Sequence, residues 1–277
     1  MRVLITGHQG FIGGYLASEL DPKDEMIGID KIEEGDNDLV MIRRNRGWDA
    51  RVKEFDPQIV YHLAAVHFVP WCRAHPVETT LNNERGMGNL LVSLARHAPN
   101  LKAIVLASSA AVYGFGRKPF DEKSPLRPVD VYGRSKVECE KLLRSFGYGR
   151  QITCVAARLS NVIGMGDTHP HLVPKIMSGE RPQLGNLWPK RDYIFVGDVA
   201  EALKRAVRLE PGFHVMNVST GVPTTPLDLV KMTGVGYDWQ PGRTDDGDLV
   251  LDPRKMQRVL DFKARTTVQE VLDHWVR

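Results

Sequence analysis

The stretch RVLITGHQGFIG, residues 2–13, decides the fold of this chain. Its apolar first half, residues 2–6, predicts a buried strand, and an amphipathic helix is expected to follow to about Leu20. Between the two, Gly7, Gly10 and Gly13 have a G-x-x-G-x-x-G spacing, which permits a tight turn and a close approach of the backbone to a pyrophosphate. The stretch therefore predicts a dinucleotide-binding turn. The alternative is a glycine turn in an α/β protein that binds no ligand.

A second apolar run, residues 26–29, ends in Asp30, seventeen residues after Gly13. An acid at this place accepts hydrogen bonds from the adenosine ribose hydroxyls, and its charge repels a 2′-phosphate. Asp30 therefore favours NAD over NADP, whereas the adjacent Lys31 acts against this preference. Asp38-Leu39 lies in a less regular segment, where it contacts adenine or belongs to an ordinary loop.

The segment Tyr132-Gly133-Arg134-Ser135-Lys136 places a phenol and an ammonium four residues apart. On a helix these two side chains share one face, so the cation is expected to lie beside the hydroxyl and to lower its pKa. A phenolate formed in this way can remove a proton from a sugar hydroxyl. The same pair also occurs on ordinary helix surfaces, where it contributes little to stability.

Two further apolar runs predict buried strands whose ends are suited to a ligand. Residues 101–109 end in Ser108 and Ser109, and open α/β sheets bind ligands at the carboxyl ends of their strands. A hydroxyl there shares a hydrogen bond with a substrate oxygen or, alternatively, caps the next turn. Residues 59–65 end in Ala64 and Ala65, whose small side chains let a flat ring lie close.

The alternation of strands and helices through about residue 160 predicts an α/β fold, a Rossmann-type doubly wound parallel sheet with helices on both faces. Beyond that point Pro and Gly become frequent, which indicates a smaller, loop-rich C-terminal substrate lobe. Residues 196–217 are expected to form a helix and a strand that return to the main sheet. The predicted domains are therefore interleaved: residues 1–160 with 196–217 bind NAD, and residues 161–195 with 218–277 form the substrate lobe.

Together these segments resemble the extended short-chain dehydrogenase/reductase superfamily, in particular its NAD-dependent epimerase/dehydratase branch. The resemblance covers nearly the whole chain and rests on motifs at residues 6–13, 62–65, 83–86, 108–114, 132–136, 158–161 and 191–193, with Arg243 and Asp248. It implies NAD as cofactor, a nucleotide sugar as substrate, and a catalytic group of Ser109, Tyr132 and Lys136. Tyr132 would act as the base, Ser109 would orient the substrate hydroxyl, and Lys136 would bind the nicotinamide ribose.

The residues and the resemblance together give two further sets of expected contacts. The residues expected to bind NAD are Gly7, Gly10, Phe11, Ile12, Gly13, Asp30, Lys31, Asp38, Leu39, Leu63, Ala64, Ala65, His67, Asn83, Ser108, Tyr132 and Lys136. The residues that the resemblance places at the substrate are Ser109, Asn161, His171, Leu172, Arg191 and Arg243. The arginines suit a diphosphate because the guanidinium fork meets phosphate oxygens bidentately. The alternative is that both are surface ion-pair partners, Arg191 with the adjacent region of Asp192 and Arg243 with Asp245 or Asp246.

The expected reaction is epimerisation of a nucleotide sugar, most simply at C4, through a transient keto-sugar. In the family's sugar dehydratases an Asp-Glu pair follows the catalytic Ser or Thr, whereas Ala110 and Ala111 stand here and cannot move protons. A keto-sugar reductase is an alternative that would prefer NADPH, which Asp30 disfavours. A dehydratase and a non-catalytic NAD sensor also remain alternatives, although a sensor would not need the intact catalytic group.

Composition bounds the remaining possibilities. The chain has 277 residues, of which 42% are hydrophobic and 26% charged, enough for one large core or for a core with a small lobe. A net charge of +3 is too small to indicate nucleic-acid binding, and no apolar run reaches the ~20 residues of a membrane span. The N-terminus enters a strand directly and three cysteines cannot form a disulfide framework, so a cytoplasmic setting is expected.

Two expectations concern metals and assembly. His62, His67, Cys72 and His75 could suggest a metal site, but their spacing matches no zinc pattern and no metal is expected. The family implies a homodimer, in which the leucine-rich helix near residues 76–97 and the helix of Tyr132 pack with their symmetry mates as a four-helix bundle.

Overall fold

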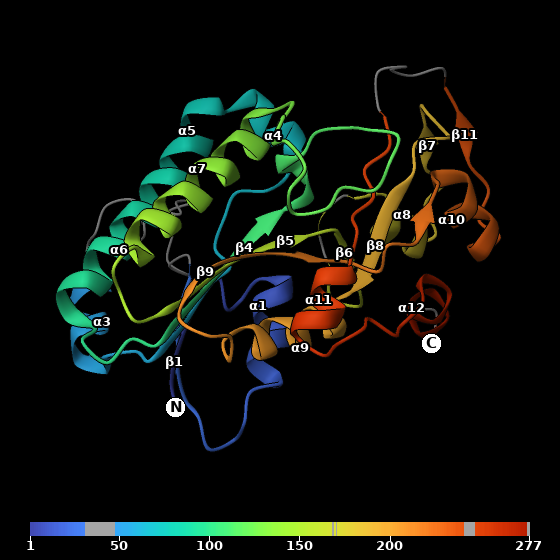
Figure 1. Ribbon diagram of the computed structural model, residues 1–277. Helices are drawn as coiled ribbons and strands as arrows, with labels where there is room; N and C mark the ends of the chain where they lie inside the picture. Colours follow the sequence, from blue (N-terminus) through green and yellow to red (C-terminus); the bar gives the residue numbers. More distant parts are fainter. Residues whose placement is uncertain (31–47, 168, 170, 241–246, 276–277) are drawn as a thin grey trace, which may run out of the picture.

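A computed structural model of the protein describes residues 1–30, 48–167, 169, 171–240 and 247–275 (Figure 1). The described residues form a six-stranded sheet in the order β2-β1-β3-β4-β5-β9, and all neighbouring strands run parallel. The strands are β1 (Arg2–Thr6), β2 (Glu25–Ile29), β3 (Ile59–His62), β4 (Ala103–Ser109), β5 (Thr153–Leu159) and β9 (Gly212–Val218). The predicted Rossmann-type parallel sheet is confirmed.

The strand order reverses at β1, because the chain first builds outward to β2 and then places β3 on the other side of β1. The last residues of β1 and β3, Thr6 and His62, are partners in register. The Thr6 hydroxyl lies 2.7 Å from Nδ1 of His62 and accepts a hydrogen bond from the Ala64 backbone at 3.3 Å. The glycine turn after β1 and the small residues after β3 are therefore held side by side at the switch point, where open α/β sheets bind ligands.

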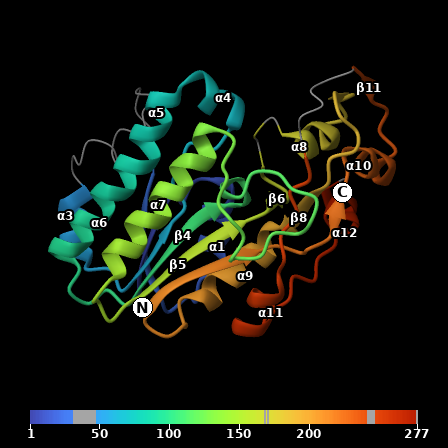
Figure 2. The same ribbon diagram turned by 45° about the horizontal axis from the view of Figure 1, so that its top comes forward.

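Helices cover both faces of this sheet (Figures 1 and 2). On one face, α1 (Phe11–Ser18), α9 (Val196–Ala206) and α11 (Arg254–Val259) share a core with Val3 and Ile5. On the other, α3 (Trp48–Phe55), α6 (Gly86–His97) and α7 (Val131–Gly147) share a core with Leu4. Because successive residues of a strand point to opposite faces, the continuous apolar run of β1 supplies both cores at once.

The helix predicted near residues 76–97 is present as three consecutive segments. Pro76 begins α5 (Pro76–Thr80), which continues through a π-helical turn at Leu81–Arg85 into α6. Proline is compatible with a first helical position, where its missing N–H has no intrahelical partner. The short helix α4 (Val69–Ala74) precedes them.

The remaining elements form a smaller unit beside the carboxyl ends of the main strands (Figure 2). Strand β8 (Arg191–Phe195) lies between β6 (Asn161–Ile163) and β10 (Pro223–Thr224), and β7 (Gln183–Leu184) pairs with β11 (Asp238–Trp239). Helices α8 (Leu172–Met177), α10 (Pro226–Thr233) and α12 (Val268–Trp275) pack on a separate core that includes Ile163, Ile176, Tyr193, Leu229 and Leu272. Helix α11 also follows residue 218, yet its Met256 packs in the main core against β9.

The start and the end of α10 show how local sequence fixes an element of this unit. Thr225 accepts a hydrogen bond from the Asp228 backbone at 3.1 Å, and the Asp228 carboxylate accepts one in return from the Thr225 backbone at 2.9 Å. This capping box satisfies backbone donors that the first turn leaves free. Gly234, with a φ of 69°, ends the helix in the left-handed conformation that glycine adopts readily. Within the described part of the chain, no helix is both long enough and apolar enough to cross a membrane.

Candidate active site

The glycine turn is a close-packed cradle. Gly7 has a φ of +76°, and a Cβ added to it would lie 2.8 Å from the Ala64 backbone nitrogen. A Cβ on Gly13 would lie 1.9 Å from the Gly7 carbonyl oxygen, a clash with backbone that no rotamer change relieves. The Gly10 backbone donates to the same oxygen at 3.1 Å. These positions therefore need glycine, and the turn has the form that suits a pyrophosphate approaching the start of α1.

Asp30 lies at the tip of β2, beside this turn. Its Oδ2 accepts a hydrogen bond from the Gln9 backbone at 2.8 Å and lies 3.8 Å from Nδ1 of His8. The His8 ring packs over Gly28, where an added Cβ would lie 2.2 Å from the ring. Asp30 is thus the acid beside the glycine turn, the position from which ribose hydroxyls are held in dinucleotide folds. The other expected contacts Lys31, Asp38, Leu39 and Arg243 lie outside the described residues.

Five more residues expected at NAD lie at the start of α1 and directly after β3. Phe11 begins α1 and its ring lies 3.3 Å from where a Cβ on Gly164 would stand, so it meets the segment after β6. Ile12 packs partly buried against the main core. Leu63, Ala64 and Ala65 follow β3 directly, and the Leu63 backbone donates to the Thr6 carbonyl at 3.0 Å.

Helix α7 brings Tyr132 and Lys136 to the carboxyl end of β4. Asp130 caps the helix by accepting a hydrogen bond from the Gly133 backbone at 2.8 Å. A Cβ on Gly133 would lie 2.6 Å from the Ala111 carbonyl oxygen, so the first turn of α7 sits directly on the segment that follows Ser109. The Ser109 side chain lies close enough to the Tyr132 hydroxyl to lower the pKa of the phenol. The structure therefore brings together the three side chains expected in the catalytic group.

The electrostatics of this group differ from the expectation. Burial raises the pKa of the Tyr132 phenol above its ordinary value, and the neighbouring Ser109 side chain acts in the opposite direction. Burial also lowers the pKa of Lys136, whose Nζ donates to the Ala107 carbonyl at 2.7 Å and lies 5.8 Å from the centre of the Tyr132 ring. The predicted acidification of the phenol by Lys136 is thus not met within the chain itself, because burial dominates the pKa of the phenol.

Glu140, a third residue on the same face of α7, was not predicted from the sequence. Tyr132, Lys136 and Glu140 are spaced i, i+4 and i+8, and Glu140 accepts a hydrogen bond from the Ser108 hydroxyl at 2.5 Å. Ser108, expected at NAD, is therefore engaged with α7. Its neighbour Ser109 has an oxygen that also accepts from the Ala111 backbone at 3.2 Å. The spacing of Glu140 on the face of Tyr132 and Lys136 was the available signal.

Glu140 forms a buried ion pair with Arg158 of β5. The guanidinium donates to its two carboxylate oxygens at 2.9 Å and 2.6 Å, and the two side chains are 6% and 4% exposed. Arg158 also donates to the Tyr113 hydroxyl at 2.8 Å, and that hydroxyl donates to Asn217 of β9 at 2.7 Å. Burial opposes the charge of Arg158, but the bonds to Glu140 dominate and raise the pKa of its guanidinium. A continuous polar network thus links α7, β4, β5 and β9 behind the site.

Asn83, also expected at NAD, spans two segments of the chain. Its amide exchanges hydrogen bonds with the Val66 backbone, accepting at 2.9 Å and donating at 3.0 Å. It also donates at 3.0 Å to Ser135, whose hydroxyl donates to the Tyr132 carbonyl at 2.8 Å. Asn83 therefore couples the segment after β3 to the first turns of α7, and these contacts give it a positioning role.

The residues expected at the substrate lie along the smaller unit. Asn161 is exposed at the start of β6, His171 is the N-cap residue of α8, and Leu172 is its first residue. Arg191 begins β8, donates to the Gly247 carbonyl at 2.8 Å and lies 5.3 Å from the ring centre of Phe115. The next residue in the chain, Asp192, has partners of its own. Asp192 is buried and accepts hydrogen bonds from Thr220 and from the backbone of Gly221 and Leu251.

The four residues of the metal alternative have separate partners. His62 contacts Thr6, and burial, helped by the charge of Lys136, lowers its pKa to about 3. His75 stacks on Trp71, whereas the His67 ring lies beside His169. Across the part of the chain that the structure describes, no group of three or more His, Cys, Asp or Glu residues is placed to hold a metal ion.

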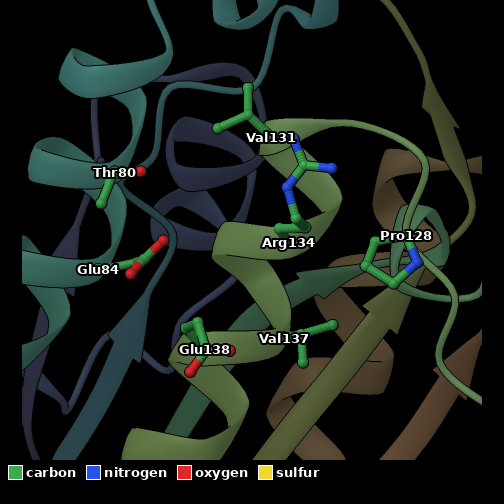
Figure 3. Close-up of a pocket in the computed structure, with 7 residues that line it drawn as sticks. All are labelled: Thr80, Glu84, Pro128, Val131, Arg134, Val137 and Glu138. Carbon is green, nitrogen blue, oxygen red and sulfur yellow. The ribbon is translucent and has the colours of Figure 1, made fainter.

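A pocket lies between α5, the π-helical turn and α7 (Figure 3). It is lined by Thr80, Glu84, Pro128, Val131, Arg134, Val137 and Glu138. None of the residues expected to bind NAD or substrate lines it. This pocket belongs to the helical layer and is distinct from the site at the strand ends.

Comparison with known proteins identifies the family. The model of the NAD dependent epimerase/dehydratase family matches residues 3–219. The chain belongs to this family. The resemblance inferred from the sequence is confirmed, and NAD is the cofactor that the family and the glycine cradle share.

Individual relatives match this chain over almost its whole length. It is 28% identical to a UDP-glucose 4-epimerase from Lactobacillus helveticus, over 96% of this chain and 92% of the relative. It is 31% identical to a GDP-6-deoxy-D-talose 4-dehydrogenase from Aggregatibacter actinomycetemcomitans, over 99% and 96%. The structure of MoeE5 in complex with UDP-glucuronic acid and NAD superposes with a TM-score of 0.89 and 26% identity, over 99% of this chain and 98% of the other.

Proposed function

We propose that this protein is an NAD-dependent nucleotide-sugar epimerase that works through a transient keto-sugar. The observation that carries the proposal is the arrangement of Ser109, Tyr132 and Lys136 at the carboxyl end of β4, next to the glycine cradle. The similarity to UDP-glucose 4-epimerases supports it.

In this proposal the residues of the chain divide the proton chemistry between them. Ser109 shares a hydrogen bond with the reacting hydroxyl, and Tyr132 takes its proton and later returns it. Lys136 contributes a positive charge close to the phenol and a donor for a ribose hydroxyl. NAD supplies the hydride acceptor and donor when it is bound. Because burial raises the pKa of Tyr132, the phenolate depends on positive charge brought to the site with the cofactor.

The sequence after Ser109 supports epimerisation over dehydration. Ala110 and Ala111 lie in a 3-10 turn of residues 110–112, and neither side chain can donate or accept a proton. A dehydratase needs such a group near the hydroxyl that leaves as water. With Tyr132 as the proton-transfer group expected at the sugar, return of the hydride to the opposite face is the reaction that the site supports.

A panel of nucleotide sugars tests the proposal. The NAD-loaded protein is incubated with UDP-, GDP- and TDP-hexoses, and epimers are followed by proton NMR while absorbance reports NADH. The expected result is an equilibrium mixture of two epimers with no accumulation of NADH. Absence of an epimer from every member of the panel would contradict the proposal.

A keto-sugar oxidoreductase is the second candidate. The relative from Aggregatibacter actinomycetemcomitans, a 4-dehydrogenase by name, is 31% identical, compared with 28% for the epimerase from Lactobacillus helveticus. Such an enzyme changes the redox state of the sugar once per turnover. Stoichiometric formation or consumption of NAD(P)H in the same panel would favour this candidate over the epimerase.

We also propose the domain division and the substrate contacts expected from the sequence. The separate core around Tyr193 and Leu229 supports a substrate lobe formed by residues 161–195 and 218–277. The packing of Met256 in the main core indicates that α11 serves as a bridge between the two parts. Asn161, Leu172 and Arg191 are proposed to hold the nucleotide diphosphate end of the substrate.

The assembly that we propose is a homodimer through α6 and α7. Val92 of α6 and Leu142 of α7 are 45% and 37% exposed, and Val77 of the preceding α5 is 64% exposed. These helices form one outer layer of the molecule (Figure 1), next to the pocket of Figure 3. Burial of such side chains in an isologous four-helix contact would stabilise a dimer.

The three buried free thiols fit the reducing cytoplasm in which we place the enzyme.

A further inference from the structure

Three histidines from two distant segments gather at the edge of the proposed site. The His67 and His169 rings lie 4.3 Å apart between centres, in an edge-to-face arrangement. His171 lies 6.0 Å from His67 and 5.8 Å from His169, and its ring also contacts Phe68 at 5.7 Å. The trio (His67, His169 and His171) is therefore a compact group of imidazoles.

The position of the trio links the two parts of the molecule. His67 follows Ala65, and thus stands just beyond the carboxyl end of β3 at the switch point. His169 and His171 precede α8 of the smaller unit, after the glycine at residue 164 that contacts Phe11. The charge of Lys136 contributes to the lowered pKa of His67, which places the trio within electrostatic reach of the catalytic group.

A fixed hydrogen bond prepares one of these imidazoles as a donor. Nδ1 of His169 lies 3.1 Å from the Asp167 carboxylate, which can only accept, so this nitrogen carries a hydrogen and Nε2 remains for another partner. The Ala65 backbone lies close enough to the His67 ring to favour its protonated form. When protonated, each ring presents a second N–H. Among the described residues, no group of three or more His, Cys, Asp or Glu side chains is placed to hold a metal ion. A set of N–H donors such as this one suits an anion.

We propose that His67, His169 and His171 form a subsite for an oxyanion of the substrate, either a carboxylate carried by the sugar or the diphosphate. The inference rests on the proposed nucleotide-sugar function and narrows the substrate class. The two sources share one chemistry, a compact group of oxygens that accepts hydrogen bonds from several imidazolium N–H donors.

The charges around the trio determine how binding responds to pH. Burial and the neighbouring imidazoles hold the pKa of His67 at about 4, and burial lowers that of His171. Lys136 opposes protonation of His67, whereas Asp167 favours protonation of His171. His67 and His171 are thus neutral near pH 7, and a bound anion raises the pKa of each. Binding therefore takes up a proton, strengthens as pH falls through the pKa of the complex, and weakens above it.

Binding measurements on the NAD-loaded protein test the subsite. Dissociation constants for UDP-glucuronate and UDP-glucose are measured by calorimetry at pH 6 and pH 8. Uptake of one proton changes affinity by up to about tenfold per pH unit, so tightening of at least about tenfold is expected. Tightening for UDP-glucuronate alone identifies a sugar carboxylate, and equal tightening for both sugars identifies the diphosphate. Affinities that do not change with pH for either sugar would overturn the subsite.

Substitutions separate the trio from other causes. His67→Asn and His171→Asn should each remove most of the tightening while leaving the melting temperature close to wild type. Asparagine also suits the helix start at position 171, where the structure shows no side-chain cap bond. His274→Asn, on the exposed face of α12, is the matched control and should retain the pH response. Retention of the full response in both trio variants would refute the assignment.

The subsite and the proposed function can fail independently. If the protein epimerises a nucleotide sugar but binds both sugars without a pH response, the subsite is wrong and the function stands. If the pH response is present but no sugar is epimerised, the subsite stands and the reaction is wrong.

Discussion

Removal of the Glu140 carboxylate should destabilise the protein far more than removal of an exposed carboxylate from the same helix. Glu140 and Arg158 are 6% and 4% exposed and share two hydrogen bonds. The variant Glu140→Ala leaves the guanidinium of Arg158 charged, buried and without its partner. Losing one member of a buried pair typically costs about 3–5 kcal/mol. For a chain of this size such a loss lowers the melting temperature by roughly 6–20 °C.

The same helix supplies a matched control. Glu138 of α7 pairs with Lys141 at 2.7 Å, but both side chains are largely exposed, at 46% and 64%. Glu138→Ala should therefore cost no more than about 0.5 kcal/mol. The double variant Glu140→Met with Arg158→Met removes both charges and should recover part of the stability lost in the single variant.

Urea unfolding and thermal melting, read by circular dichroism, measure these differences. The expected order of stability is wild type and Glu138→Ala, then the double variant, then Glu140→Ala. If Glu140→Ala has the same urea midpoint and melting temperature as Glu138→Ala, the buried pair does not hold α7 against β5 and the reasoning fails. Catalytic rate should follow the same order, because α7 carries Tyr132 and Lys136.

The other predictions concern the cofactor, the reaction, the substrate and assembly. Tyr132→Phe should lower kcat by about 100- to 10,000-fold while NAD still binds; turnover above a few per cent would remove Tyr132 from its role. Asp30→Asn keeps an acceptor for the Gln9 backbone but removes the negative charge that repels a 2′-phosphate. In fluorescence titration, the difference between the binding free energies of NAD and NADP should therefore shrink by about 1–4 kcal/mol. Equal affinities for NAD and NADP in the wild type would disprove this role of Asp30. Arg191→Ala should weaken UDP-sugar binding about 10- to 100-fold in calorimetry with NAD affinity unchanged, and wild-type affinity would refute a diphosphate contact. Light scattering at micromolar concentration should give twice the mass of the chain, and Leu142→Asp should give the monomer; a monomeric wild type would count against the dimer.

Local sequence was sufficient to predict the parts of the site that depend on short-range geometry. The glycine spacing predicted the turn because Gly7 and Gly13 meet within one loop, and the pair Tyr132 and Lys136 lies within one helix. The apolar runs likewise predicted parallel strands, since the main strands are covered on both faces.

Contacts between segments far apart in the chain could not be predicted in the same way. Glu140 meets Arg158 and Ser108, and His67 meets His169, only after the sheet has formed. The direction of the Tyr132 pKa shift was also missed, since a sequence shows the spacing of a cation but not the desolvation of a phenol. Asn83 is expected at the cofactor from its sequence motif, and its bonds with the Val66 backbone and Ser135 could be found only in the fold.

The most direct test of the central claim follows the hydrogen at C4 of the sugar. The NAD-loaded protein is given the UDP sugar that the panel identifies, deuterated at C4, and the product is examined by NMR and mass spectrometry. A transient keto-sugar with return of the same hydride predicts an epimer that retains its deuterium, with no net change in NADH. Loss of the label from the product, or NAD(P)H turnover in proportion to product, would contradict the account.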